Sequence, residues 1–265
     1  MPPSNTPISS VQSLARALDL LEAFPRLGPE IGLSRIAAEL GLSKATAYRL
    51  LSTLEERGYV ERSPGSRDYR LGLRAFELGS YYHSQLEVRQ MALPLMREMT
   101  AQTGEATFLC VREGDQAVCV ERVDASAQMM VFALRVGGQQ PLHCGAAPRA
   151  LLAGLSDAEV RDYAERTGLP AFTEHTITHI DQLLEDVRCT RREGFVFSQD
   201  DMTRGIAAVG APVYDHTGSV IASLSLSGLS NHYDTERVAV LGSLVARAGG
   251  RLSRQFGYRA PLPQP

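Results

Sequence analysis

Apolar residues recur at every third or fourth position near the start of the chain, which is the period of an α-helix with one buried face. In SVQSLARALDLLEAF, residues 10–24, this spacing predicts a first helix, which Pro25, Gly28 and Pro29 are expected to end. Its apolar face comprises Val11, Leu14, Leu18, Leu21 and Phe24. A second, shorter helix is expected over residues 34–40. The pattern therefore predicts a helical unit at the start of the chain.

A third helix is predicted over residues 44–57, between Ser43, a residue type that favours the N-cap position, and Gly58. Its apolar positions predict the inward face, which comprises Ala47, Leu50, Leu51 and Leu54. The opposite face carries small, basic and hydroxyl-bearing residues, namely Lys44, Ala45, Tyr48, Arg49 and Ser52. Such a face suits the major groove of DNA, where the N-terminal end of a reading helix reaches base edges.

Two strand-like runs, YVER and DYRL, flank the turn SPGSR and predict a β-hairpin. Arg62, Arg67 and Arg70 of this hairpin are expected to be available for DNA phosphates. A helix with a few basic residues is, taken singly, usually a solvated surface helix. The whole succession of helix, short helix, capped helix and hairpin is a rarer combination, and it predicts a winged helix-turn-helix over residues 10–73.

The expected DNA contacts lie mostly on the third helix. They are Ser34, Ser43, Lys44, Ala45, Thr46, Tyr48, Arg49 and Arg67. Tyr48 has an alternative role, which is to pack against the hairpin. Winged helices also mediate contacts between proteins, so a protein-interaction module without DNA affinity is an alternative function. Steep salt dependence of DNA binding distinguishes the two, because phosphate contacts release counterions.

Helical spacing continues over residues 74–87, the expected linker helix, and over residues 88–103. The linker is more apolar than a free spacer requires, which suggests contacts between two copies. Alternating patterns then predict strands at ATFLCVRE, QAVCVERVD, MMVFALRV, GFVFS, IAAVGAPVYD and SVIASLSLSG. With the helices between them, these strands predict an α+β domain with a mainly antiparallel sheet over residues 88–257. Residues 1–9 and 258–265 are proline-rich and are expected to be disordered tails.

Two features of the second domain suggest a pocket for a small molecule. In HCGAAPRALL a loop becomes a helix, and the backbone N–H groups of Ala146 and Ala147 are expected to hold a carboxylate. In SVIASLSLSG, Ser223, Ser225 and Ser227 share one face of a strand, opposite an apolar face. The serine face either lines a polar cavity or faces water, and the sequence leaves both interpretations open.

Signatures of catalysis and of metal binding are weak. Cys144 follows His143 directly, so their side chains diverge on an extended segment, and Cys144 is expected to line the pocket. An enzyme that uses Cys144 is nevertheless a second alternative. His175 and His179 have the spacing of helical metal ligands, but no Glu or Cys completes a site nearby. With no phosphate-binding glycine motif present, we expect no catalytic residues, no metal and no cofactor.

Composition indicates where the protein works. The 265 residues carry a formal net charge of −3, and 44% are hydrophobic, as in ordinary globular proteins. No apolar run approaches the roughly 18 residues of a membrane helix, and the N-terminus lacks the pattern of a signal peptide. The four cysteines are scattered and form no C-x-x-C pair. We therefore expect a cytoplasmic protein with reduced thiols and no membrane contact.

Several stretches, taken in order, resemble the IclR family of bacterial transcription regulators. They are SLARALDLLEAF, LSRIAAELGLSKATAYRLLSTLEERGYVER, YRLGLRAFELG, PLHCGAAPRALLAGL and GFVFSQDDMTRGIAAVGAPVYDHTGSVIASLSLSG. The resemblance implies a winged helix, a linker helix and a GAF-like effector domain. It also implies homodimers or tetramers, as dimers of dimers, that bind operator DNA as repressors or activators. The implied effector is a small organic acid such as glyoxylate, pyruvate or an aromatic carboxylate.

The resemblance also assigns effector-binding positions, residue by residue. They are Met129, Phe132, Ala146, Ala147, Ser198, Gln199, Ala208, Ser225 and Ser227. The chain departs from the common pattern in two places. Pro148 and Arg149 replace a Gly-Lys pair, and Ser198 and Gln199 replace an acidic pair. These departures leave the identity of the effector open.

Overall fold

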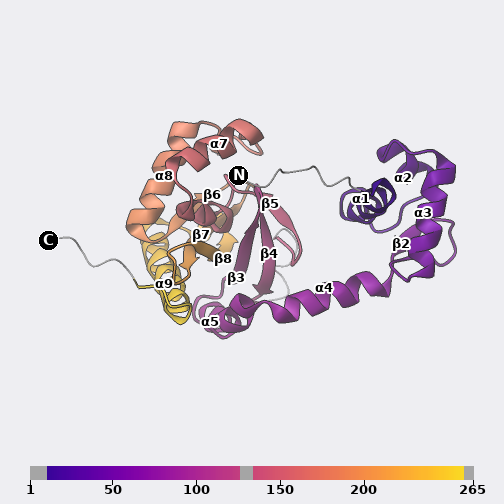
Figure 1. The fold of residues 1–265 in the computed structure, drawn as a ribbon. Coiled ribbons are helices and arrows are strands. Elements are labelled where there is room, and N and C mark those ends of the chain that lie inside the picture. The colour runs from indigo at the N-terminus through magenta and orange to yellow at the C-terminus, as the bar shows by residue number, and fades with distance from the viewer. Residues whose placement is uncertain (1–10, 126–133, 260–265) are drawn as a thin grey trace, which may run out of the picture. The chain divides into compact units, whose positions relative to one another are not determined.

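The computed structural model describes residues 11–125 and 134–259, and the chain divides into two compact units, Met1–Gln85 and Leu86–Pro265 (Figure 1). Each unit has an apolar core of its own. The first unit is helical with a small hairpin, and the second is built on a six-stranded sheet. The predicted α+β class is therefore confirmed.

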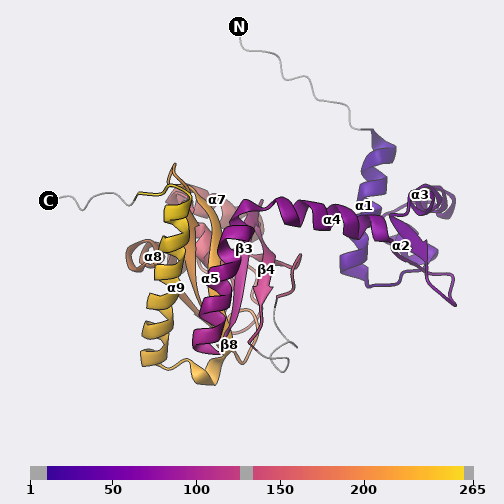
Figure 2. The same cartoon turned by 90° about the horizontal axis from the view of Figure 1, so that it is seen from below.

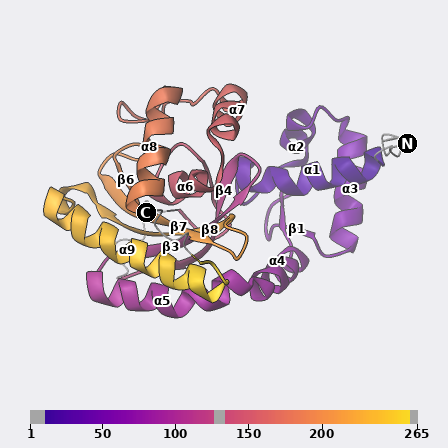
Figure 3. The ribbon, with the colours of Figure 1, turned by 60° about the vertical axis from the view of Figure 1, so that its left-hand side comes forward.

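The N-terminal unit packs its first three helices and its hairpin around one apolar core, and a fourth helix follows (Figure 3). Its elements are α1 (Gln12–Leu27), α2 (Leu33–Glu39), α3 (Lys44–Glu56), β1 (Val60–Arg62), β2 (Tyr69–Leu71) and α4 (Leu73–Gln85). β1 and β2 pair antiparallel, and Ile31 makes a further bridge to Tyr69 that ties the hairpin to the helices. Ile31, Leu51 and Tyr69 are almost completely buried. The predicted winged helix-turn-helix is confirmed.

The first helix differs from the prediction in two ways. It continues through Pro25 and ends at Gly28, which has φ of 122°. A proline in the last turn removes only one backbone hydrogen bond, so the helix does not have to stop there. The predicted apolar face was also partly wrong, because three of its residues are exposed, whereas Phe24 is buried as predicted and Leu20, which was not predicted, is buried beside it in the core. The exposed three are Val11, Leu14 and Leu18.

The second unit contains one antiparallel sheet with the strand order β5-β4-β3-β8-β7-β6. Its strands are β3 (Ala106–Glu113), β4 (Gln116–Val123), β5 (Gln139–Pro141), β6 (Val196–Gln199), β7 (Ile206–Tyr214) and β8 (Val220–Leu229). The strand expected over residues 129–136 falls partly outside the described residues. Its described part, residues 134–136, is not a strand, and β5 pairs with β4 a few residues later.

Helices cover both faces of this sheet. They are α5 (Glu87–Thr103), α6 (Ala146–Leu151), α7 (Asp157–Thr167), α8 (Ile180–Glu193) and α9 (Thr235–Gln255). Figure 2 shows α5 and α9 side by side on one face, where Leu224 and Leu226 of β8 pack against them. Helices α6, α7 and α8 cover the other face. The serine side of β8 points to this second layer.

Helix α6 lies directly on the sheet. Gly210 of β7 makes this possible, because a Cβ atom there would lie 2.6 Å from the carbonyl oxygen of Ala146. The hydroxyl of Ser223 donates a hydrogen bond of 2.8 Å to the carbonyl oxygen of Ala147. Ser223 and Ser225 are 0% and 3% exposed. The sequence left open whether the serine face meets water, and its buried position excludes that interpretation for these two residues.

Candidate functional site

The start of α3 is held by a side-chain cap. The hydroxyl oxygen of Ser43 accepts a hydrogen bond of 3.2 Å from the backbone N–H of Thr46. The two hydroxyl groups also lie 2.9 Å apart. This cap satisfies one of the N–H groups that a helix start leaves unpaired, so the helix begins at Lys44 as predicted.

The outward face of α3 is exposed and cationic. Ala47 and Leu51 are completely buried, whereas Lys44, Ala45 and Arg49 are exposed. Neither Lys44 nor Arg49 has a carboxylate partner within residues 11–125 and 134–259. Their charges are therefore available to a ligand outside the protein, and duplex DNA is the ligand that such a helix suits. Tyr48 is 50% exposed on the same face.

The hairpin offers fewer free cations than the sequence suggested. Arg70 pairs with Glu61 at 2.6 Å. Arg62 lies over the ring of Tyr69, 4.1 Å from its centroid. The expectation that both arginines are available for phosphates was therefore wrong, because short-range partners engage them. Arg67 is exposed at the turn and has no carboxylate partner in the described part of the chain.

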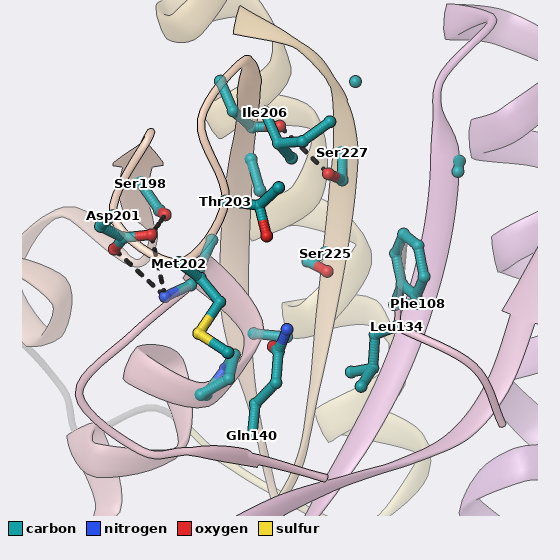
Figure 4. Close-up of a pocket in the computed structure, with 18 of the residues that line it drawn as sticks. Phe108, Leu134, Gln140, Ser198, Asp201, Met202, Thr203, Ile206, Ser225 and Ser227 are labelled. Carbon is teal, nitrogen blue, oxygen red and sulfur yellow. Dashed lines mark hydrogen bonds between the residues drawn. The ribbon is translucent and has the colours of Figure 1, made fainter. Parts of the chain in front are cut away.

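The second unit contains a cavity of about 430 Å³ between α6 and the sheet (Figure 4). It lies between β3, β7 and β8 and reaches the turn that joins β6 to β7. Its polar side chains are Gln140, Ser198, Asp201, Thr203, Ser225 and Ser227. Its large apolar side chains are Phe108, Leu134, Met202, Ile206 and Leu229. This mixture of an apolar wall with a few polar groups is typical of small-molecule sites.

Hydrogen-bonding capacity is left over inside this cavity. The N–H groups of Ala146 and Ala147 have no partner among the described residues, and Pro148 has no N–H. Ser225 is 3% exposed, and its hydroxyl likewise has no hydrogen-bond partner in the described protein. Ser227 donates to the carbonyl oxygen of Ala207 at 3.1 Å and can still accept a bond. A polar ligand would satisfy these groups.

Asp201 is the charged group of the cavity. Its carboxylate accepts a hydrogen bond of 2.6 Å from the hydroxyl of Ser198. It also accepts bonds of 3.2 and 3.1 Å from the backbone N–H of Gly145, the residue that precedes α6. Thr176 donates a bond of 2.6 Å to the backbone oxygen of Asp201. Asp201 therefore connects three segments around the cavity.

Arg149 of α6 supplies the positive charge behind Asp201. Its guanidinium lies 3.4 Å from Asp201 and 2.7 Å from Asp186 of α8, and it also donates to the carbonyl oxygen of Phe197. Burial raises the pKa of Asp186, although the charge of Arg149 acts in the opposite direction. This buried network separates the cavity from a second hollow of about 420 Å³ that Gln199 and Cys189 help to line.

The structure brings most of the expected effector residues together. Those that line the cavity are Ala146, Ala147, Ser198, Ala208, Ser225 and Ser227. Cys144 is buried beside it and is not part of its lining, and Gln199 lines the second hollow instead. The side chain of Gln199 points to the opposite side of β6 from Ser198, as alternation along a strand requires. Met129 and Phe132 lie outside the described residues.

Cys144 and His143 are placed for packing. Burial raises the pKa of the Cys144 thiol to about 12, so the nucleophilic thiolate is scarce. The ring nitrogens of His143 lie 2.9 Å from the hydroxyl of Tyr163 and 3.0 Å from the carbonyl oxygen of Pro170. Both ring nitrogens are thus engaged, and His143 is not free to activate the thiol. In the described ranges, no group of three metal-binding side chains comes together.

Sequence reasoning missed several residues that line the cavity. They are Phe108, Gln140, Asp201, Met202 and Thr203. One signal was present for Asp201. Arg149 lies in the apolar stretch AAPRALL, and a buried arginine requires a carboxylate partner. No signal along the chain indicated which of the acidic residues that partner would be.

Two family models match the chain. The model for the IclR helix-turn-helix domain matches residues 13–64, and the model for the bacterial transcriptional regulator IclR C-terminal region matches residues 80–254. The chain belongs to the IclR family. The resemblance inferred from the sequence motifs is thereby confirmed.

Curated relatives agree with this assignment. The HTH-type transcriptional regulator XynR of Escherichia coli (strain K12) is 32% identical over 94% of this chain and 99% of its own length. The transcriptional repressor IclR of the same organism is 28% identical over 93% of this chain and 90% of its own length. These IclR-family relatives are transcriptional regulators and not enzymes. This chain is accordingly a transcriptional regulator with a DNA-binding helix-turn-helix and a C-terminal effector domain.

A solved structure of similar fold holds a ligand. The crystal structure of an IclR homolog from Microbacterium hydrocarbonoxydans complexed with 4-hydroxybenzoate is 26% identical, covers 92% of this chain and 99% of its own, and has a TM-score of 0.79. Among the described residues, no helix of this IclR-family chain is long and apolar enough to cross a membrane.

Proposed function

We propose that this regulator binds operator DNA through α3 and the hairpin, and that a small organic acid in the cavity changes its affinity for that DNA. The acid is glyoxylate- or pyruvate-like, or an aromatic carboxylate. The observation that carries the proposal is Ser225, which is 3% exposed, lines a cavity of about 430 Å³ and has a hydroxyl without a hydrogen-bond partner among the described residues. The proposal places the protein in the cytoplasm, where its DNA and its effector meet.

On the DNA side, the proposed contacts surround the start of α3. They are Ser34, Ser43, Lys44, Ala45, Thr46, Tyr48, Arg49 and Arg67. The support is that Lys44, Arg49 and Arg67 have no carboxylate partner in the described residues, so DNA does not have to displace an internal ion pair. Arginine and lysine side chains of this kind contact both phosphates and guanine edges.

On the effector side, the acid group is proposed to take the unpaired N–H groups that begin α6. The proposed contacts are Ala146, Ala147, Ser198, Ala208, Ser225 and Ser227. Ala208 is small and leaves room, and the hydroxyl of Ser225 supplies a donor from the sheet, because Ser198 and Ser227 already donate to Asp201 and to the carbonyl oxygen of Ala207. A neighbour of the same fold with bound 4-hydroxybenzoate supports an acid of this general kind.

We also propose that the working form is a homodimer, or a tetramer made from two dimers. Large apolar side chains are exposed along α1 and α4 of the N-terminal unit. They are Val11, Leu14, Leu18, Leu73, Phe76, Leu78, Tyr81 and Tyr82, each at least 49% exposed. Monomeric proteins rarely expose so many large apolar residues, so a second copy is expected to cover those of at least one of these helices.

Sedimentation analysis of the full chain tests this interface. Phe76→Glu places a charge on the apolar side of α4 and is expected to shift the protein toward monomer. Val240→Glu changes a residue of α9 that is also exposed, at 57%, and is the matched control. If only the Val240 variant dissociates, the interface lies on the effector unit instead.

The acid response is tested by measuring both ligands together. Free energy couples two sites only if the acid prefers one of the DNA-binding states, and couplings of about 1–3 kcal/mol change DNA affinity roughly 5- to 150-fold. A thermal-shift screen of organic acids identifies a binder, and fluorescence anisotropy with promoter DNA then measures the coupling. Ser225→Ala combined with Ser227→Ala should remove the response and leave DNA binding intact. Ser243→Ala, on the exposed side of α9, is the control. Full acid binding by the double variant would contradict the proposal.

A further inference from the structure

The described residues that line the effector cavity include an acidic side chain and no basic one. Of the described residues that line it, Asp201 is the one ionisable group, and it is 5% exposed. A ligand anion in this part of the chain must therefore be held by N–H and O–H groups alone. Such groups stabilise one buried carboxylate when several of them converge on it, but they leave no counter-charge for a second.

The cation nearest to Asp201 is already shared. Arg149 lies 2.7 Å from Asp186 and 3.4 Å from Asp201, and its side chain is 5% exposed. One buried positive charge thus faces two carboxyl groups. Its attraction for an additional anion is weak, because the surrounding carboxylates cancel the charge of Arg149.

A second buried carboxylate, Glu105, lies on the opposite face of the sheet from the cavity, because Gly228 alternates with the cavity-lining Ser227 along β8. The Glu105 side chain packs against Gly228 so closely that a Cβ atom there would lie 1.9 Å from Oε2 of Glu105. Glu105 is 4% exposed, and the cation beside it is Arg237 at 3.5 Å. Glu105 is thus paired on the α9 side of the sheet, and Asp201 remains the carboxylate that an effector in the described part of the cavity would meet.

We propose that the cavity selects effectors with a single negative charge and rejects dicarboxylates of the same shape, with Asp201 as the residue that sets this limit. The inference rests on the proposed acid-binding function and specifies the charge of the effector. Opposite Asp201, the wall is formed by Phe108 and Leu134, with Ser225 and Thr203 between (Figure 4). The rest of the effector is accordingly a neutral group, apolar or hydroxylated, that packs on this wall.

Matched pairs of ligands test the charge limit on the full chain. Succinate is compared with its monoamide succinamate, and terephthalate with its monoamide 4-carbamoylbenzoate, because an amide has almost the shape of a carboxylate without its charge. Isothermal titration calorimetry at pH 7.5 gives the affinities. In the pair that binds, we expect the dicarboxylate to bind at least about tenfold more weakly, since no counter-charge meets its second carboxylate.

Two variants assign the effect to Asp201. Asp201→Asn keeps the shape of the side chain and removes its charge. It should reduce or abolish the difference in affinity between each dicarboxylate and its monoamide. Asp200→Asn is the matched control, because Asp200 is the preceding residue, does not line the cavity, and accepts a bond from the N–H of Gly205. It should leave the difference unchanged.

The outcomes separate this inference from the function on which it rests. If a dicarboxylate binds the unmodified protein as tightly as its monoamide, the charge limit is overturned while acid binding stands. If Asp200→Asn changes the difference as much as Asp201→Asn, the role of Asp201 is overturned. If none of these acids nor any acid of the thermal-shift screen binds, the proposed function and this inference fail together.

Discussion

The two units use their arginines in opposite ways. In the N-terminal unit, Arg49 and Arg67 are exposed and lack carboxylate partners among the described residues. In the effector unit, Arg149 is 4% exposed and lies between Asp186 and Asp201. The first arrangement leaves charge available to a large anionic partner, and the second uses the charge to hold the protein together. The same residue type therefore indicates binding in one unit and internal structure in the other.

The buried and the exposed arginines should differ most in how much stability the protein loses when their charge is removed. Replacing Arg149 by Met leaves two buried carboxylates without their cation, which should lower the free energy of unfolding by about 3–5 kcal/mol. Arg192→Met is the control, because the Arg192 side chain is 61% exposed and contacts Glu193 and the sulfur of Cys189 at the surface, so its loss should lower the free energy of unfolding by less than about 1 kcal/mol. Urea unfolding followed by circular dichroism measures both. If both variants lose the same free energy of unfolding, Arg149 does not hold the effector unit together in the way that its buried position suggests.

The converse expectation holds for the DNA-reading helix. Arg49→Ala should leave folding almost unchanged and weaken binding to promoter DNA by about 1–3 kcal/mol if Arg49 contacts a base pair through two hydrogen bonds. Arg57→Ala, at the far end of α3, is the matched exposed control. A gel-shift titration measures both variants. If Arg49→Ala binds as tightly as the unmodified protein, Arg49 is not a DNA contact.

The buried His143 should make the stability of the effector unit depend on pH. Burial lowers the pKa of His143, so its ring is neutral in the folded protein, while in the unfolded chain it titrates near its usual value of about 6.5. Below that pH the unfolded chain takes up a proton that the folded protein resists. Stability should therefore fall as pH drops from about 6.5 to 5, by up to about 1.4 kcal/mol per pH unit.

Thermal melts of the unmodified protein and of His175→Asn across this range test the effect. His175 has an exposed side chain, so its replacement should leave the pH dependence in place. A flat melting temperature between pH 5 and 6.5 in the unmodified protein would show that His143 accepts a proton without cost.

The smallest expected effect concerns Lys44. If it contacts one phosphate, Lys44→Gln should weaken binding to all DNA sequences alike and reduce the slope of log affinity against log salt by about 0.9. Anisotropy titrations at several salt concentrations measure the slope. An unchanged slope with lost sequence preference would instead assign Lys44 to a base edge, which sharpens the account of how α3 reads DNA.

Local patterns predicted the N-terminal unit well because its elements depend on neighbours in sequence. Ser43 caps the helix that follows it, and Ala47 and Leu51 face the core at helical spacing. The prediction failed where a tertiary contact decided the outcome. Arg62 and Arg70 are engaged by Tyr69 and Glu61, each several residues away across the hairpin.

The effector cavity could be predicted only in part, for the same reason. The alternation along β8 placed Ser225 and Ser227 on one face, and the cavity does lie on that face. The partner of Arg149 comes from a turn 52 positions later in the chain, and Gln140 reaches the cavity from β5, a strand expected elsewhere. Spacing along a sequence does not specify which distant segments meet, so these residues were found only in three dimensions.

Gly210, which lies beneath α6, also suggests a way in which the proposed response to the organic acid can be lost during evolution. A methyl group on Gly210 would collide with the backbone of Ala146 and push the first turn of α6 toward the space that the acid is proposed to occupy. A glycine codon becomes an alanine codon by one base change. If the proposed function is correct, a single nucleotide change can thus produce a regulator that still binds its promoter DNA but no longer responds to its organic acid.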